Sequence, residues 1–550
     1  MINQQLAAAK TLGNPVQRIA VMLRGADLLW LHEREKSRST FAEAFELAKE
    51  TYKTQGDAPT RAGRGLLMET PDQRFVVIRA VARRDPRWAS KLLDELLKED
   101  SLPSNDSRSS QATFDERTPE KLLRTAMSLL PQDMNAAMGF ADASLRFSAG
   151  YSLTPFLYKL SEADQSAADE FYRRALVVYG AKPLREFLYL AAYPFGLNTT
   201  GDMPVIGSYT VPGTFRPNST LQLLFARTLI GRAQGSLEAG VAERDNYNGL
   251  SGVGHIVQAI TMVEPQVSKQ FPDLASQLVQ TRSQLLNSLP AETQAALSRT
   301  EDADQNADDR TFEERLEEIE KQANADKRDE LLVHLILHGG SSESLENITR
   351  ATAKISDTTI RSQVLDWVYF NRAQRALKDK SFDEASKAAS RVQEMDQRAY
   401  LYSEIAKAII LQPESQIIVR DLLEQIVGTA EKAPTTIVTA RALLAAANLY
   451  LKFDPDRAVS VLATAIKTTN QLESPDFGPQ LVMRKIEGRN FATYAAYKTA
   501  SFDPESAFRE MAKIDYDSAI VQSSAISDKA LRAHIAYALA DFCLAKPKLK

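Results

Sequence analysis

The chain has 550 residues, of which 44% are hydrophobic and 25% are charged, an ordinary balance for a globular protein. A single compact core does not reach this length, whereas a repeat array does, because each of its units packs only on its neighbours. The 67 basic and 71 acidic residues give a net charge of −4, which argues against a general nucleic-acid-binding protein.

The single cysteine, Cys543, allows no internal disulfide and no cysteine-based metal cluster. The first 15 residues lack the charged start and apolar run of a signal peptide, and no uncharged apolar run is long enough to span a bilayer. We therefore expect a cytoplasmic protein, or a secreted or periplasmic one if a leader has been removed. Cys543 falls in an apolar last helix, where we predict a packed and unreactive thiol.

Helical signals dominate the first 190 residues of the sequence. Asn14 is a predicted N-cap with Pro15 in the first turn, and Asp85-Pro86 repeats that start. Residues 61–91 hold eight basic and three acidic side chains, with Arg79 and Arg83 on one helical face. The simpler interpretation is a solvated face; the alternative is a surface that docks an acidic partner, a phosphate-bearing ligand or the chain's own acidic segment.

The helical pattern stops between residues 193 and 218, where four prolines and four glycines occur. A small hairpin is predicted over residues 205–211. The segment is rich in aromatic and β-branched residues, which disordered segments usually lack, so we expect it to be ordered. It either folds back onto the concave face of the array or presents a binding site to a partner. The candidate binding residues are Tyr193, Phe195, Tyr209, Phe215 and Arg216.

Residues 301–320 hold ten acids and two arginines, and we predict that 300–310 links an N-terminal half, 1–299, to a C-terminal half, 311–550. Carboxylates and an asparagine within 302–313 match ligand positions of a calcium loop. Ala307 stands where such a loop needs glycine. A solvated linker is therefore the better interpretation, and calcium binding stays open.

The C-terminal half carries the clearest repeat. Predicted first helices begin with arginines at 328, 361, 398 and 441, at separations of 33, 37 and 43 residues. Predicted second helices begin at sites such as Asp454-Pro455, where the aspartate caps the helix and the proline fits its first turn. One helix pair cannot bury its own apolar surface, so it needs stacked copies. We predict an all-α superhelical array of antiparallel helix pairs, with one non-helical insertion near 193–218.

Two motifs resemble a known repeat family. The stretch 382–385 (Phe-Asp-Glu-Ala) resembles the turn and second helix of a tetratricopeptide repeat, and Ala447 with Tyr450 resembles the small and aromatic pair of its first helix. Lys380 stands where the family has a glycine before the turn. The resemblance implies a tetratricopeptide-like α-solenoid whose concave surface binds peptides or partner proteins and has no chemistry of its own.

No sequence motif points to catalysis. His334 and His338 share a helical face at the spacing of a zinc-binding HExxH motif, but Leu335 replaces the glutamate and no third ligand is evident. The glycines at 249, 252 and 254 follow no predicted strand and lack the lysine of a nucleotide loop. We therefore predict no catalytic residue, no metal site and no cofactor, although these patterns do not exclude an enzyme.

The expected function is that of a non-catalytic scaffold that binds a partner protein or peptide through a helical-repeat groove. The alternative is a helical enzyme or a small-ligand carrier whose site lies beside the Gly/Pro-rich loops. We expect no nucleic acid and no membrane span, and the sequence leaves the oligomeric state open.

Overall fold

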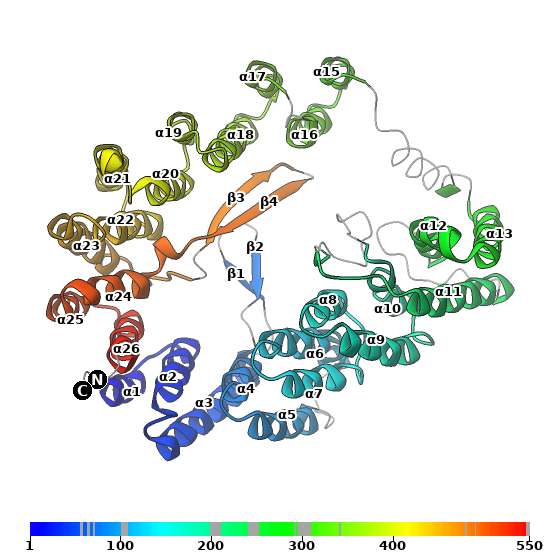
Figure 1. The fold of residues 1–550 in the computed structure, drawn as a ribbon, viewed down its shortest axis with the longest axis horizontal. Helices are drawn as coiled ribbons and strands as arrows, with labels where there is room; N and C mark the ends of the chain where they lie inside the picture. The colour runs from blue at the N-terminus through cyan, green and yellow to red at the C-terminus, as the bar shows by residue number, and fades with distance from the viewer. Residues whose placement is uncertain are drawn as a thin grey trace. The chain divides into compact units, whose positions relative to one another are not determined.

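A computed structural model describes residues 1–55, 59–62, 66–69, 72–100, 108–197, 211–239, 252–290, 293–294, 310–339, 343–478, 481–489 and 491–545. The chain divides into two compact units. Unit 1 comprises Met1–Thr40 with Asp309–Lys550, and unit 2 comprises Phe41–Asp308. Both are predominantly α-helical, as predicted (Figure 1). Within the described residues, no helix is long and apolar enough to cross a membrane.

Unit 1 begins with an N-terminal helix pair and continues with the helices of the C-terminal half. Its elements are α1 (Ile2–Ala9), α2 (Pro15–Leu29), the start of α3 (Arg34–Gln55), α15 (Phe312–Glu320), α16 (Ala325–His334) with a π-helical turn (Leu335–Gly339), α17 (Leu345–Ala353), α18 (Thr358–Lys378), α19 (Phe382–Ala389), α20 (Met395–Ile409), α21 (Gln416–Lys432), α22 (Ile437–Tyr450), α23 (Pro455–Asn470), β3 (Leu481–Glu487), β4 (Ala492–Lys498), α24 (Pro504–Ile514), α25 (Tyr516–Ser524) and α26 (Lys529–Ala545). Short 3-10 turns lie at Pro413–Ser415 and Ala500–Phe502.

Unit 2 takes the rest of α3 and the helices that follow it. Its elements are β1 (Pro59–Ala62), β2 (Leu66–Glu69), α4 (Gln73–Ala82), α5 (Pro86–Asp100), α6 (Arg108–Leu129), α7 (Met134–Ser144), α8 (Leu153–Ala163), α9 (Gln165–Tyr179), α10 (Leu184–Leu188), a 3-10 turn (Tyr193–Phe195), α11 (Ser219–Ala239), α12 (Gly252–Gln270) and α13 (Pro272–Ser288).

The helix starts predicted from caps are present. The side chains of Asn14, Asp454 and Asp503 each accept a hydrogen bond from a first-turn backbone N–H, and a proline follows each of them. Such a side chain accepts from a first-turn N–H that the helix itself leaves unpaired. Proline has no backbone N–H, so it leaves no unpaired donor at its position. These local signals place α2, α23 and α24 without any tertiary information.

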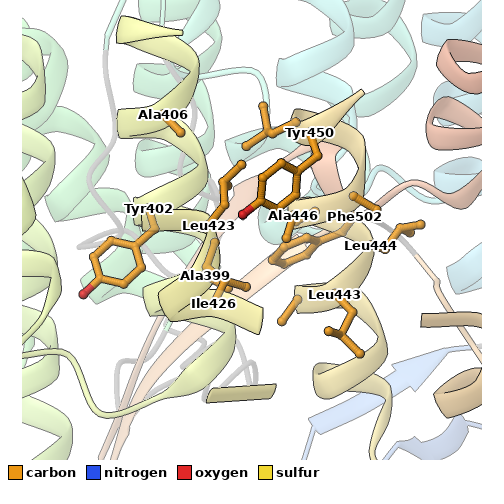
Figure 2. Close-up of a cluster of buried hydrophobic side chains, with 14 of the residues drawn as sticks. Ala399, Tyr402, Ala406, Leu423, Ile426, Leu443, Leu444, Ala446, Tyr450 and Phe502 are labelled. Atoms are coloured by element: carbon orange, nitrogen blue, oxygen red, sulfur yellow. The ribbon is translucent and has the colours of Figure 1, made fainter. Parts of the chain in front are cut away.

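Helix pairs repeat along unit 1. The first helices α18, α20 and α22 pack on each other in succession, and the second helices α19, α21 and α23 each pack on their own first helix. Every residue from Ala442 to Tyr450 on α22 is buried, because α20, α21 and α23 all pack against this helix. Small alanines among them allow close approach, and Leu443, Ala446 and Tyr450 belong to one buried cluster with Leu423 and Ile426 of α21 (Figure 2).

Two arginines of the sequence repeat, Arg361 and Arg398, tie their helix to the turn before it, and Arg18 and Arg532 outside that set do the same. Arg328 instead donates to the Ser356 hydroxyl, and Arg441 donates to the carbonyls of Asp476 and Phe477. In four cases the guanidinium donates to the backbone carbonyl six residues earlier, which is just outside the helix. The bonds run from Arg18 to Leu12, from Arg361 to Ile355, from Arg398 to Val392 and from Arg532 to Ile526, with N···O distances of 2.6–3.2 Å. A charged donor on an otherwise unpaired carbonyl fixes the angle at which the chain enters the helix.

Two buried aspartates link successive helix pairs. Each presents both carboxylate oxygens to two consecutive backbone N–H groups 27 and 28 residues farther along the chain. Asp329 accepts from Ser356 (2.8 Å) and Asp357 (3.0 Å), and Asp366 accepts from Gln393 (2.7 Å) and Glu394 (3.1 Å). Each aspartate thus pairs two N–H groups of the turn that precedes the next first helix, which holds neighbouring units in register.

The N-terminal helices α1 and α2 pack with the C-terminal helices. The predicted division into halves 1–299 and 311–550 placed these two groups of helices apart. Both α1 and α2 pack against α26. Arg24 on α2 forms a two-pronged ion pair with Glu505 on α24, at 2.8 and 2.6 Å. The division between the units at 308 and 309 falls inside the predicted linker, most of which lies outside the described residues. The apolar faces of α1 and α2 need a partner, and sequence spacing does not identify it.

This contact between terminal helices should make unit 1 sensitive to acid. Burial and the positive charge of Arg24 lower the pKa of His534 on α26 from its usual value near 6.5 to about 4, while Asp528 opposes them. Between those two values the unfolded chain binds a proton that the folded chain does not. The stability contribution of neutral His534 is therefore complete above pH 6.5 and is lost as the pH falls toward 4.

Chemical denaturation of the wild type measures its unfolding free energy at pH 7 and at pH 4.5. His534 should lower the value at pH 4.5 by at most about 3 kcal/mol. In the His534→Gln variant that part of the difference should disappear, because glutamine does not titrate. An unchanged dependence of unfolding free energy on pH in the variant would rule out His534 as its source.

The prediction of a wholly helical fold with one insertion misses two β-ribbons. Strands β1 and β2 pair antiparallel in unit 2, and β3 and β4 pair antiparallel in unit 1. Of the hairpin predicted over 205–211, residues 205–210 lie outside the described residues, and Val211 has no regular secondary structure.

Candidate binding surfaces

The predicted binding residues in unit 2 lie mostly inside its core. Tyr193, Phe195 and Phe215 are buried, with exposures of 0%, 1% and 6%. Arg216 is exposed and donates to the carbonyls of Gly213 and of Phe215. Tyr209 lies outside the described residues. The binding role of this segment stays a prediction, and among the described candidate residues only Arg216 is exposed.

A polar and aromatic network holds the described ends of the segment. The Tyr193 hydroxyl donates to Asp169 at 2.9 Å, and the amide of Asn218 donates to the other Asp169 oxygen at 2.6 Å. The Tyr193 ring lies 5.0 Å from the Phe215 ring and 5.4 Å from the Tyr158 ring, centroid to centroid. Burial and the negative charge of Asp169 raise the pKa of Tyr193 well above its usual range. Such a network is an element of folding stability.

Neighbouring helices also satisfy the backbone of this segment. Side chains donate hydrogen bonds to four backbone carbonyls between residues 190 and 195. Tyr172 donates to Leu190, Tyr158 to Ala192, Gln222 to Pro194 and Gln266 to Phe195. Irregular backbone is tolerated inside a helical core only when its polar groups are paired in this way. The described ends of the segment thus fold back into unit 2.

His334 is the last residue of α16, and His338 lies in the π-helical turn that follows. The rings of His334 and His338 lie 4.5 Å apart, and both side chains are exposed. Partial burial and the neighbouring His338 lower the pKa of His334. Across the described ranges, no three His, Cys, Asp or Glu side chains gather closely enough to hold a metal ion. Residues 302–309 and 249–251 lie outside those ranges.

The prediction of a packed Cys543 is wrong, because the thiol is exposed. The buried face of α26 runs from Ala530 to Ala540, and Cys543 falls beyond its last buried turn. The density of apolar residues in α26 gave no sign of where this face ends.

Among the described cations of the basic stretch 61–91, Arg79 and Arg84 are half-buried, and Arg74 is buried and pairs with Asp72 at 2.9 Å. Burial and the adjacent positive charge of Arg83 lower the pKa of Arg79 on α4. Arg83 itself is exposed, as the solvated-face interpretation expects.

The most distinctive feature of unit 1 is the way in which the ribbon β3–β4 is attached to its helices. Arg484 in β3 is only 1% exposed. Its guanidinium donates to Asn371 (2.9 Å), to the Tyr497 hydroxyl (3.0 Å) and to the Trp367 carbonyl (2.9 Å). The guanidinium carbon lies 3.9 Å from the centroid of the Trp367 ring and 4.2 Å from that of Phe370. Burial lowers the pKa of Arg484 to about 10.

Hydrogen bonds between helix side chains and the backbone of β3 fix the strand edge that faces the helices. The amide of Gln397 on α20 donates to the Met483 carbonyl at 3.5 Å, and the Glu487 N–H donates to Gln363 on α18 at 2.9 Å. The backbone groups of odd-numbered residues in β3 therefore point to the helices, and those of even-numbered residues point to β4. Figure 1 accordingly shows β3 on the side of the ribbon nearer α18 and α20, and β4 on the far side.

Among the described residues, no strand pairs with the outer edge of β4. The register pairs residue 484 with 495 and residue 486 with 493, so the backbone groups of 493, 495 and 497 bond to β3. The N–H and C=O groups that point away belong to Ala492, Tyr494, Ala496 and Lys498. Within the described residues none of these groups takes part in a hydrogen bond. Their side chains are all exposed. No pattern in the sequence indicates this edge.

Comparisons with known proteins give no assignment. No profile of a known protein family matches the chain, and no curated protein matches it in sequence. Among solved structures the chain is similar to one titled "Circular tandem repeat protein with novel repeat topology and enhanced subunit contact surfaces", over 99% of this chain and 96% of that one. The identity is 12% and the TM-score is 0.14, values too low to carry an argument about fold or function.

Proposed function

We propose that this protein is a non-catalytic scaffold that binds an extended segment of a partner protein along the outer edge of β4. The observation that carries the proposal is the row of unpaired backbone groups at Ala492, Tyr494, Ala496 and Lys498. A peptide that adds to such an edge gains a backbone hydrogen-bonding partner at every second residue. Unpaired edges of this length are otherwise avoided, because they invite aggregation.

The attachment of the ribbon supports this function. Arg484, Gln363 and Gln397 hold β3 on α18 and α20 before any partner arrives. An edge that is already fixed requires little ordering when a peptide binds, so more of the interaction energy appears as affinity.

The helix pairs supply the platform. We infer that they stack as a tetratricopeptide-like α-solenoid, and the recurring arginine bonds and the paired aspartate links of Asp329 and Asp366 support that arrangement. A protein partner is proposed over nucleic acid because the chain has a net charge of −4.

Selection of short random peptides on the immobilised protein tests the proposal. Peptides that bind the wild type should lose at least about tenfold in affinity for the Ala496→Pro variant, since proline removes one outward N–H and its hydrogen bond. That N–H is not part of the ladder with β3, so the ribbon should keep its stability.

The matched control is Ala496→Thr, which keeps the N–H and suits a strand. Peptides should bind this variant as they bind the wild type. Recovery of no peptide, or of peptides that bind the proline variant equally well, would contradict the proposed function.

A further inference from the structure

A second surface of unit 1, separate from the ribbon, is a groove of about 660 Å³ beside α20 and α21. Sites for small ligands span roughly 300–1,000 Å³, so the groove has a suitable size. Arg398 and Tyr402 line it from α20, and Gln425, Thr429 and Lys432 line it from α21. Figure 2 shows Tyr402 extending away from the buried cluster around Tyr450. No acidic side chain is present among the described residues that line the groove.

The two cations of the groove have no ion pair among the described residues. Within the described residues, neither Arg398 nor Lys432 has a carboxylate within 4.0 Å. The other two cations of α20 and α21 are paired: Lys407 with Glu404 and Arg420 with Asp454. The described lining of the groove thus holds two cations and no carboxylate, which favours an anion.

The hydrogen bonds already made show which groups are left for a ligand. Arg398 uses Nη1 on the Val392 carbonyl at 3.1 Å and keeps its other N–H groups. The Tyr402 hydroxyl donates to the Gln425 Oε1 at 2.9 Å, which turns that amide so that its NH₂ is unspent. The hydroxyl of Thr429 donates to the Gln425 carbonyl at 2.7 Å. The hydroxyl oxygens can then only accept.

A glycine keeps the wall of the groove open. Gly428 lies on α21 between Gln425 and Lys432, and a Cβ built on it meets no atom within 4 Å. Glycine inside a helix is destabilising by roughly 0.5–1 kcal/mol relative to alanine.

We propose that this groove binds a small phosphate monoester that also carries hydroxyl groups, such as a sugar phosphate. Arg398, Lys432 and the Gln425 amide supply donors for the phosphate oxygens, as charge-assisted bonds prefer. The hydroxyl oxygens of Tyr402 and Thr429 accept from the ligand's own hydroxyl groups. Charge, spare donors and spare acceptors in the groove all match this one class of ligand.

Calorimetric titration of the full chain tests the proposal at constant ionic strength, with glucose 6-phosphate, inorganic phosphate and glucose as separate probes. Glucose 6-phosphate should bind saturably and more tightly than inorganic phosphate, and glucose alone should not bind. Lys432→Gln should weaken binding at least about tenfold. Lys407→Gln, which removes a cation already paired with Glu404 outside the groove, should leave binding unchanged.

A steric pair of variants separates binding from folding. Gly428→Leu should abolish binding by filling the groove, whereas Gly428→Ala should retain it, and neither should melt below the wild type, because both replace a helical glycine with a better helix former. Absence of saturable binding, or equal binding by the leucine variant, would overturn the proposal. The Ala496→Pro variant should bind glucose 6-phosphate normally, so failure here is distinct from failure of the peptide-binding function.

Discussion

Replacing Arg484 by alanine is expected to lower the unfolding free energy of unit 1 by about 3 kcal/mol and to release the ribbon. The substitution removes three hydrogen bonds and the packing of the guanidinium against Trp367 and Phe370. It also leaves a cavity and removes the donor to the side-chain Oδ1 of Asn371. Desolvation of the charge, which lowers the pKa of Arg484 to about 10, offsets part of this loss.

Urea denaturation of Arg484→Ala beside Lys485→Ala measures the effect. Lys485 is the next residue in β3, lies on the opposite face of the ribbon and pairs with the partly exposed Glu487. Its removal should change the unfolding free energy by no more than about 0.5 kcal/mol. Similar losses in the two variants would mean that Arg484 does not anchor the ribbon.

Replacing Phe215 by alanine is expected to lower the unfolding free energy of unit 2 by about 3–5 kcal/mol. The ring lies 5.1 Å from that of Tyr158 and 5.0 Å from that of Tyr193. Gly196, with a φ of +62°, brings its backbone against the same ring, where a Cβ would come within 3.2 Å. The site is tightly packed on several sides, so the cavity left by alanine should not collapse easily.

Arg216→Ala is the matched control, because the side chain is exposed and bonds only to nearby carbonyls. Its effect should stay within about 0.5 kcal/mol. If Phe215→Ala were as mild as Arg216→Ala, the aromatic residues would be free for a partner, and the binding site predicted for 193–218 would regain its basis.

The elements that the sequence predicted are those with local causes. Asp454-Pro455 and Asp503-Pro504 place helix starts because capping involves residues within one turn. The repeat arginines were recognised by spacing alone. The bond that Arg361 and Arg398 make to a carbonyl six residues earlier became evident only in three dimensions.

The contacts that join distant residues left no local signal. Asp366 holds backbone groups 27 and 28 residues away, and Arg24 pairs with Glu505 across most of the chain. No spacing rule identifies such partners.

The ribbon β3–β4 was missed for a different reason. Val482, Arg484 and Ile486 share the buried face, and an inward-facing arginine breaks the apolar alternation that predicts a strand. The turn at Gly488 was the available signal. The groove beside α20 and α21 depends on which cations lack a carboxylate partner, and that is a property of packing and not of sequence order.

The central claim is that β4 offers an open edge for a partner strand, and residue-resolved amide hydrogen exchange tests it most directly. The amides of Thr493, Ala495 and Tyr497, which bond to β3, should exchange slowly, whereas those of Tyr494, Ala496 and Lys498 should exchange fast. Addition of a selected peptide should slow the second set. Uniformly slow exchange along β4 without a peptide would show that the edge is already covered and would contradict the proposed function.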